Sequence, residues 1–237
     1  MNPCADRHEP EPSFARPLAI LAGLLIVAAG VRLLPETGRP FPFFELELVR
    51  WREMLTLFIL TPLVTFELWD LKRRVHLTGR MEWAYLGALA LLLISMGIHE
   101  PMNALSRKAA LLPAELAATV RFWDDEFSHY TFFAGFTALS LLLVIGQLRS
   151  PRATPEHRNG FIIVIAAALA LAAVIFRNMI REPTLPDIAV GLSILVLTVL
   201  LWIRHPVSPR RAPLVFSLVL GYALGFGAAL ITHWISG

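Results

Sequence analysis

Apolar stretches of similar length recur from one end of the chain to the other. Each is close to the roughly 20 residues that a helix needs to cross a hydrocarbon core of about 30 Å. We identify seven of them, at residues 17–34, 54–70, 84–103, 127–148, 160–177, 186–203 and 212–234. Because backbone groups in lipid must be paired within their own segment, each stretch is predicted to be a helix. The expected fold class is therefore an all-α, polytopic transmembrane helical bundle of about seven helices.

The remaining residues leave no room for a second domain. We expect residues 1–16 to form a short cytoplasmic tail and residues 17–237 to form a single transmembrane helical domain. The longest connection, 104–124, is expected to be an outer interfacial segment containing a short amphipathic helix, with Pro113 in its first turn. The first apolar stretch is interpreted as a retained helix, because its leader is not clearly basic and no small-x-small cleavage site follows it.

Composition and charge fit a membrane protein and indicate its orientation. The chain is 56% hydrophobic and 16% charged, whereas soluble domains carry roughly 25% charged residues. Basic residues gather in the alternate loops 71–82, 149–159 and 204–211, which the positive-inside rule places in the cytoplasm. This predicts an N-in, C-out topology. These loop arginines are explained by topology and contact with anionic lipid, so the lipid bilayer is the expected partner and nucleic acid is not.

Ionisable side chains collect at the ends of the apolar stretches on the predicted outer side. They are His99, His129 and His233, together with Asp125 and Asp187. Such groups are costly at membrane depth and usually have a function. Asp125 lies four residues before His129, so the two share a helix face. Asp187 begins a predicted helix, where it is either a catalytic carboxylate or a cap that complements the helix dipole.

These residues suggest a metal-dependent hydrolase or transferase. His99, His129 and His233 would hold Zn²⁺ and leave one coordination position open, as in catalytic three-histidine sites. A water bound there becomes a nucleophile near neutral pH. Asp125 would orient His129 or act as a base, and Ser95, four residues before His99, would stabilise the developing oxyanion.

Small residues in the last predicted helix indicate close packing. Gly221 and Gly225 form a small-xxx-small pattern, which lets helices approach closely in lipid. This face is predicted to point into the bundle and to bring His233, two turns after Gly225, with it.

The same residues also allow a reading without catalysis. The chain would then be a transporter or an envelope assembly or resistance factor, and the His/Asp groups would form a proton relay or a structural hydrogen-bond network. Whether the chain is an enzyme stays open at this stage. Glu100, Asp124 and Glu126 lie at the water boundary, where solvation is the simpler interpretation. Cys4 is the single cysteine, which excludes an intramolecular disulfide and a cysteine-based metal cluster.

The pattern resembles VanZ-like bacterial membrane proteins and the similar YjdF-type proteins. Their motif has an Asp-x3-His that opens a helix, then an Arg with prolines and an Asp that enters a later helix, preceded by a His-Glu pair. The matching positions here are His99, Glu100, Asp125, His129, Arg181, Pro183, Pro186, Asp187 and Gly191. The resemblance covers roughly residues 45–200 in layout. It implies a protein of the bacterial inner membrane that is linked to envelope lipids.

A fainter resemblance is to the CREST membrane hydrolases. It is carried by Ser95-x3-His99 with Asp125, and it implies seven helices and a zinc ion held by three histidines. The last helix of that family carries His-x3-His, whereas here Ala229 precedes His233, so His129 would have to replace the missing ligand. The outer-side position of the His/Asp cluster suits a lipid-linked substrate.

Overall fold

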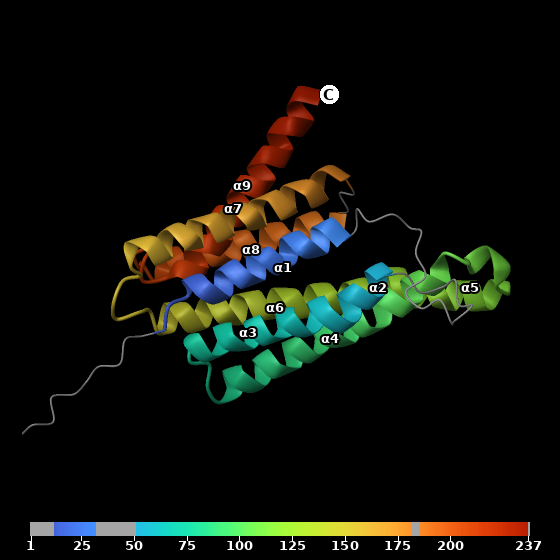
Figure 1. Ribbon diagram of the computed structural model, residues 1–237, viewed down its shortest axis with the longest axis horizontal. Coiled ribbons are helices and arrows are strands. Elements are labelled where there is room, and N and C mark those ends of the chain that lie inside the picture. Colours follow the sequence, from blue (N-terminus) through green and yellow to red (C-terminus); the bar gives the residue numbers. More distant parts are fainter. Residues whose placement is uncertain (1–11, 32–50, 182–184, 237) are drawn as a thin grey trace, which may run out of the picture.

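A computed structural model describes residues 12–31, 51–181 and 185–236 (Figure 1). The elements within these ranges are all helical. In chain order they are α1 (Ala15–Val31), α2 (Trp51–Leu55), η1 (Thr56–Leu60), α3 (Thr61–Arg74), α4 (Arg80–Ser106), η2 (Ala109–Leu111), α5 (Ala114–Arg121), η3 (Phe122–Phe127), α6 (Ser128–Arg149), α7 (Arg158–Arg181), α8 (Leu185–Arg204) and α9 (Pro213–Ser236).

Six helical segments are long and apolar enough to cross a membrane. They are Arg52–Arg74, Arg80–Ser106, Ala114–Arg149, Arg158–Arg181, Leu185–Arg204 and Pro213–Ile235. The helical fold class is thus confirmed, and the chain has the build of a multi-pass membrane protein. α1 is apolar as well, but it has 17 residues and is shorter than the other six segments. The predicted count of seven membrane helices therefore stays a prediction, as does the N-in, C-out orientation.

The helices form two groups (Figure 1). In one group α7 packs against α1 and α9, and α8 against α9. In the other group α4 packs against α6, and α3 lies beside α4. Contacts of α1 with α3 and of α6 with α8 connect the two groups.

Large apolar side chains cover much of the outer surface of these helices. Phe58, Phe66, Trp83 and Leu200 are between 50% and 75% exposed. In water such a surface would promote association, whereas in a bilayer the lipid chains cover it. The exposure pattern therefore agrees with the membrane-spanning lengths.

Glycines lie at two close contacts between helices. A Cβ atom at Gly221 or Gly225 would lie 2.8 Å from a side-chain atom of α7, at Leu171 or Ile175 respectively. The predicted small-residue face of the last helix thus does pack closely, with α7 as its partner. A Cβ atom at Gly135 of α6 would lie 2.8 Å from backbone atoms of α4. These contacts fix the spacing of α7 from α9 and of α4 from α6.

The structure divides the predicted 104–124 connection between the end of one helix and the start of the next. α4 continues to Ser106, and the helix that begins at Ala114 runs through α5 and η3 into α6 without a break. Pro113 lies at the N-cap of α5, one residue before the first helical position. Its missing N–H costs nothing there, because the first N–H groups of a helix have no partner in the helix. In Figure 1, α5 extends beyond the end of the helix pair formed by α4 and α6.

Candidate functional site

The structure places an imidazole against a buried carboxylate where the end of α4 meets η3. His99 Nδ1 lies 3.0 Å from Asp124 Oδ1, and the Asp124 side chain is 5% exposed. No aligned hydrogen bond with a described residue reaches this Oδ1, so the His99 ring is the ionisable group that faces it. Burial of a carboxylate is unfavourable without such a partner.

A π-helical turn explains why Asp124 faces α4. Residues Phe122–Phe127 form η3, in which each turn holds one more residue than an α-helical turn. This insertion changes which of two neighbouring aspartates points toward α4. Asp124 is buried there, whereas Asp125 is exposed.

Two serines hold this region of α4 and α6 together. Ser95 Oγ on α4 donates a hydrogen bond of 2.7 Å to the backbone oxygen of Ser128. Ser128 Oγ donates to the backbone oxygen of Asp124 and lies 3.4 Å from His99 Nδ1. Both serines are almost fully buried. They position the helices on which His99 and Asp124 lie.

His129 lies beside His99. The centroids of the two rings are 5.1 Å apart, and the ring planes are inclined by 72°. His129 Nδ1 lies 2.9 Å from the backbone oxygen of Asp125, which can only accept a hydrogen bond, so Nδ1 carries a proton. The lone pair of a neutral His129 is then on Nε2. His99 Nδ1 lies 3.0 Å from Asp124 Oδ1, and a proton on that nitrogen would leave the lone pair of the ring on Nε2.

The residues singled out from the sequence are only partly brought together. Ser95, His99 and His129 lie at one place, and Asp125 joins them through its backbone oxygen rather than through its carboxylate. Asp187 lies in the first turn of α8 and is half-buried.

His233 is the third predicted metal ligand. It is exposed in the last turn of α9 and makes no hydrogen bond, ion pair or ring contact with a described residue. Across residues 12–31, 51–181 and 185–236, no group of three or more His, Cys, Asp or Glu side chains is arranged to hold a metal ion. The three-histidine zinc site therefore stays a prediction.

Three buried polar residues at this end were not singled out from the sequence. Asp124 and Glu100 were interpreted as solvated, yet they are 4% and 7% exposed. Glu53 of α2 is 4% exposed, and its Oε1 lies 2.9 Å from Arg107 Nη1 at the end of α4. Their burial depends on which neighbouring helix covers them, and the order of residues along the chain carries no sign of that.

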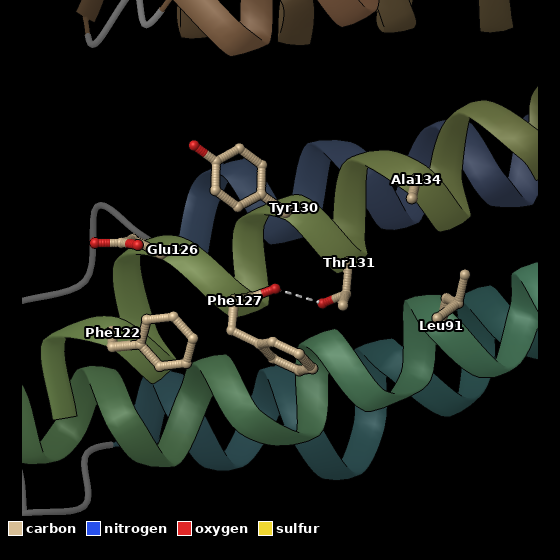
Figure 2. Close-up of a pocket in the computed structure, with 7 residues that line it drawn as sticks. All are labelled: Leu91, Phe122, Glu126, Phe127, Tyr130, Thr131 and Ala134. Atoms are coloured by element: carbon tan, nitrogen blue, oxygen red, sulfur yellow. Dashed lines mark hydrogen bonds between the residues drawn. The ribbon is translucent and has the colours of Figure 1, made fainter. Parts of the chain in front are cut away.

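A shallow hollow lies in the surface between α4 and the η3–α6 segment (Figure 2). Its lining is mostly apolar and aromatic. The residues that line it are Leu91, Phe122, Glu126, Phe127, Tyr130, Thr131 and Ala134. Glu126 is the one carboxylate among them.

Fold and site together define a class: a multi-pass helical membrane protein with an imidazole–carboxylate pair at one end of a closely packed helix pair. No protein-family model, curated protein or solved structure matches the chain. The resemblance to VanZ-like and YjdF-type proteins therefore stays a prediction.

Proposed function

We propose that the chain is a hydrolase or transferase of the bacterial cytoplasmic membrane that acts on a lipid-linked substrate, with His99 and Asp124 as its reactive pair. The observation that carries the proposal is the buried carboxylate 3.0 Å from His99 Nδ1. Charged groups at the ends of apolar helices are costly and usually functional. A carboxylate in this position orients an imidazole and stabilises the imidazolium that forms when the ring takes a proton.

In this proposal His99 accepts a proton at Nε2 from the attacking water or hydroxyl group. The second imidazole, His129, whose ring centroid lies 5.1 Å from that of His99, would contact the leaving group. General-base catalysis of this kind contributes about 10²- to 10⁴-fold to a rate. The Ser95 hydroxyl already donates its hydrogen bond to the backbone oxygen of Ser128, so we assign Ser95 a positioning role here, and its predicted oxyanion role stays open.

The proposal also includes a membrane topology with seven spans. α1 has 17 residues, close to the lower limit of about 17–25 for a membrane helix, and it would be the seventh span. With the basic loops in the cytoplasm, His99 and Asp124 lie on the outer side. A site there meets lipid-linked substrates of the cell envelope.

The proposal also includes a bound zinc ion. His129 Nδ1 is hydrogen-bonded to a backbone oxygen, and His99 Nδ1 lies 3.0 Å from a carboxylate oxygen. Metal-binding histidines usually have such an oxygen beside the ring nitrogen that does not bind the metal. The described residues supply these two imidazoles and no third ligand beside them, so we assign no catalytic step to the metal. The metal content of the purified protein, compared with a His129→Ala variant, tests this part alone.

The chain offers a matched pair of variants for the main test. Asp124→Asn and Asp125→Asn make the same change at neighbouring positions, one buried against His99 and one exposed. Detergent-purified protein would be assayed for cleavage of a panel of lipid-linked phosphates and acyl esters by lipid mass spectrometry. We expect Asp124→Asn and His99→Ala to reduce turnover by about 100-fold or more, and Asp125→Asn to retain most of it. Equal loss in both aspartate variants, or full turnover by His99→Ala, would contradict the proposal.

A structural hydrogen-bond network is the second candidate. The hydrogen bond from Ser95 to the Ser128 backbone oxygen favours it, because this bond is buried and ties α4 to α6. It predicts no turnover of any panel member, together with lower stability of Asp124→Asn in a detergent unfolding titration.

A further inference from the structure

We propose that the hollow between α4 and the η3–α6 segment binds a phospholipid with an ammonium headgroup, such as phosphatidylethanolamine. One acyl chain would lie in the hollow and Glu126 would face the ammonium. This inference concerns lipid binding and does not depend on the chemistry proposed for His99.

The lining favours a hydrocarbon ligand. Leu91, Phe122 and Tyr130 are 38%, 46% and 65% exposed, so the apolar surface is accessible. The hydroxyl of Thr131 is used within the helix, where it donates to the backbone oxygen of Phe127 at 2.8 Å. The lining therefore offers few polar groups to a water-soluble ligand. Both walls belong to segments that can cross a membrane, where a void unfilled by lipid would forfeit dispersion contacts.

Polarity changes along the hollow in the direction expected for a lipid. Figure 2 shows Phe122 and Glu126 near one end, and Leu91 and Ala134 at the other. Leu91 lies in the middle of α4, whereas Glu126 lies in η3, before α6 begins. A headgroup at Glu126 would therefore let its chain run along α6 toward the middle of the helices.

The negative charge of Glu126 favours a lipid headgroup that carries an ammonium. Glu126 is exposed and makes no hydrogen bond or ion pair with a described residue. Phe122 and Tyr130, four residues before and after it, line the same hollow. A carboxylate flanked by aromatic rings attracts an ammonium group, because the rings add a cation–π contribution. The same carboxylate repels an anionic headgroup such as that of phosphatidylglycerol.

The test measures retained lipid by native mass spectrometry after exchange into detergent with equal amounts of phosphatidylethanolamine and phosphatidylglycerol. We expect a preference of about fivefold for phosphatidylethanolamine, as a carboxylate–ammonium contact at an exposed site provides. Glu126→Gln should remove the preference. Glu115→Gln, which removes an equally exposed carboxylate outside the hollow, should keep it.

A second pair of variants tests the chain-binding part. Ala134→Phe fills the hollow and should abolish retention of both lipids, whereas Ala173→Phe, at an exposed position on α7, should not. An undiminished preference in Glu126→Gln, a preference for phosphatidylglycerol, or normal retention in Ala134→Phe would overturn the inference. Lipid retention by His99→Ala separates the two proposals: normal retention with lost turnover is expected if both are right. Normal retention with unchanged turnover would reject only the proposed function.

Discussion

Replacing Gly135 with alanine should force α4 and α6 apart and weaken the candidate site. The added Cβ atom would lie 2.8 Å from Ala88 O and from Leu92 N, about 0.6 Å short of ordinary contact at 3.4 Å. Both neighbours are backbone atoms of α4, so neither can rotate away. The helices themselves must separate.

The expected magnitude combines two opposing effects. Overpacking of this kind costs about 1–3 kcal/mol, whereas exchanging glycine for alanine inside a helix favours folding by about 0.5–1 kcal/mol. The net expectation is a loss of about 1–2 kcal/mol of unfolding free energy. Gly87→Ala on α4 is the control, because nothing lies within 4 Å of its added Cβ atom, and it should be neutral or slightly stabilising.

Stability would be measured by titrating detergent-solubilised protein with dodecyl sulfate and following helicity by circular dichroism. The site is affected because Ser95 Oγ lies 2.7 Å from the Ser128 backbone oxygen, and a separation of about 0.6 Å would take this pair beyond the usual hydrogen-bond range of about 3.0 Å. Gly135→Ala should therefore also lower any turnover that depends on His99. Equal stability of Gly135→Ala and Gly87→Ala would show that α4 and α6 are not in close contact at Gly135.

Three further predictions concern the helix contacts. Gly225→Ala should be destabilised by about 1–2 kcal/mol in the same titration, because the Cβ atom would meet α7, whereas Gly227→Ala, with nothing within 4 Å, should be neutral or slightly stabilising. Gln147→Leu should lower the thermal unfolding temperature, because the side chain accepts a 2.9 Å hydrogen bond from Val215 N at the start of α9, and a buried unpaired N–H costs about 1–3 kcal/mol. Ser95→Ala should lower the unfolding free energy by about 1 kcal/mol in the dodecyl sulfate titration. An unchanged midpoint would contradict the positioning role of Ser95.

The helices were predictable because the membrane imposes a length on them. The stretches predicted at 160–177 and 186–203 correspond to Arg158–Arg181 and Leu185–Arg204. The observed helices extend further because polar residues continue a helix beyond the apolar part, where water can satisfy the backbone. Apolarity therefore locates these two helices but places their ends too far inward.

Contacts between helices were predictable only where a residue type requires them. The glycine spacing in the last predicted stretch indicated a closely packed face, and Gly221 and Gly225 do pack against α7. The same face was expected to carry His233 inward. Burial along it extends to Ala229, whereas His233 is exposed, because a helix can continue past the end of its neighbour.

Which of Asp124 and Asp125 is buried beside His99 could not be predicted from the sequence. α-Helical spacing associates Asp125 with His129, and that turn does connect them, but through the backbone oxygen of Asp125. The π-helical turn contains one more residue than an α-helical turn, and it buries Asp124 beside His99 instead. No apolar repeat encodes this insertion, since it depends on how η3 packs against α4. Because one inserted residue determines which carboxylate meets the imidazole, comparing Asp124→Asn with Asp125→Asn tests the observed helix geometry and the proposed chemistry together.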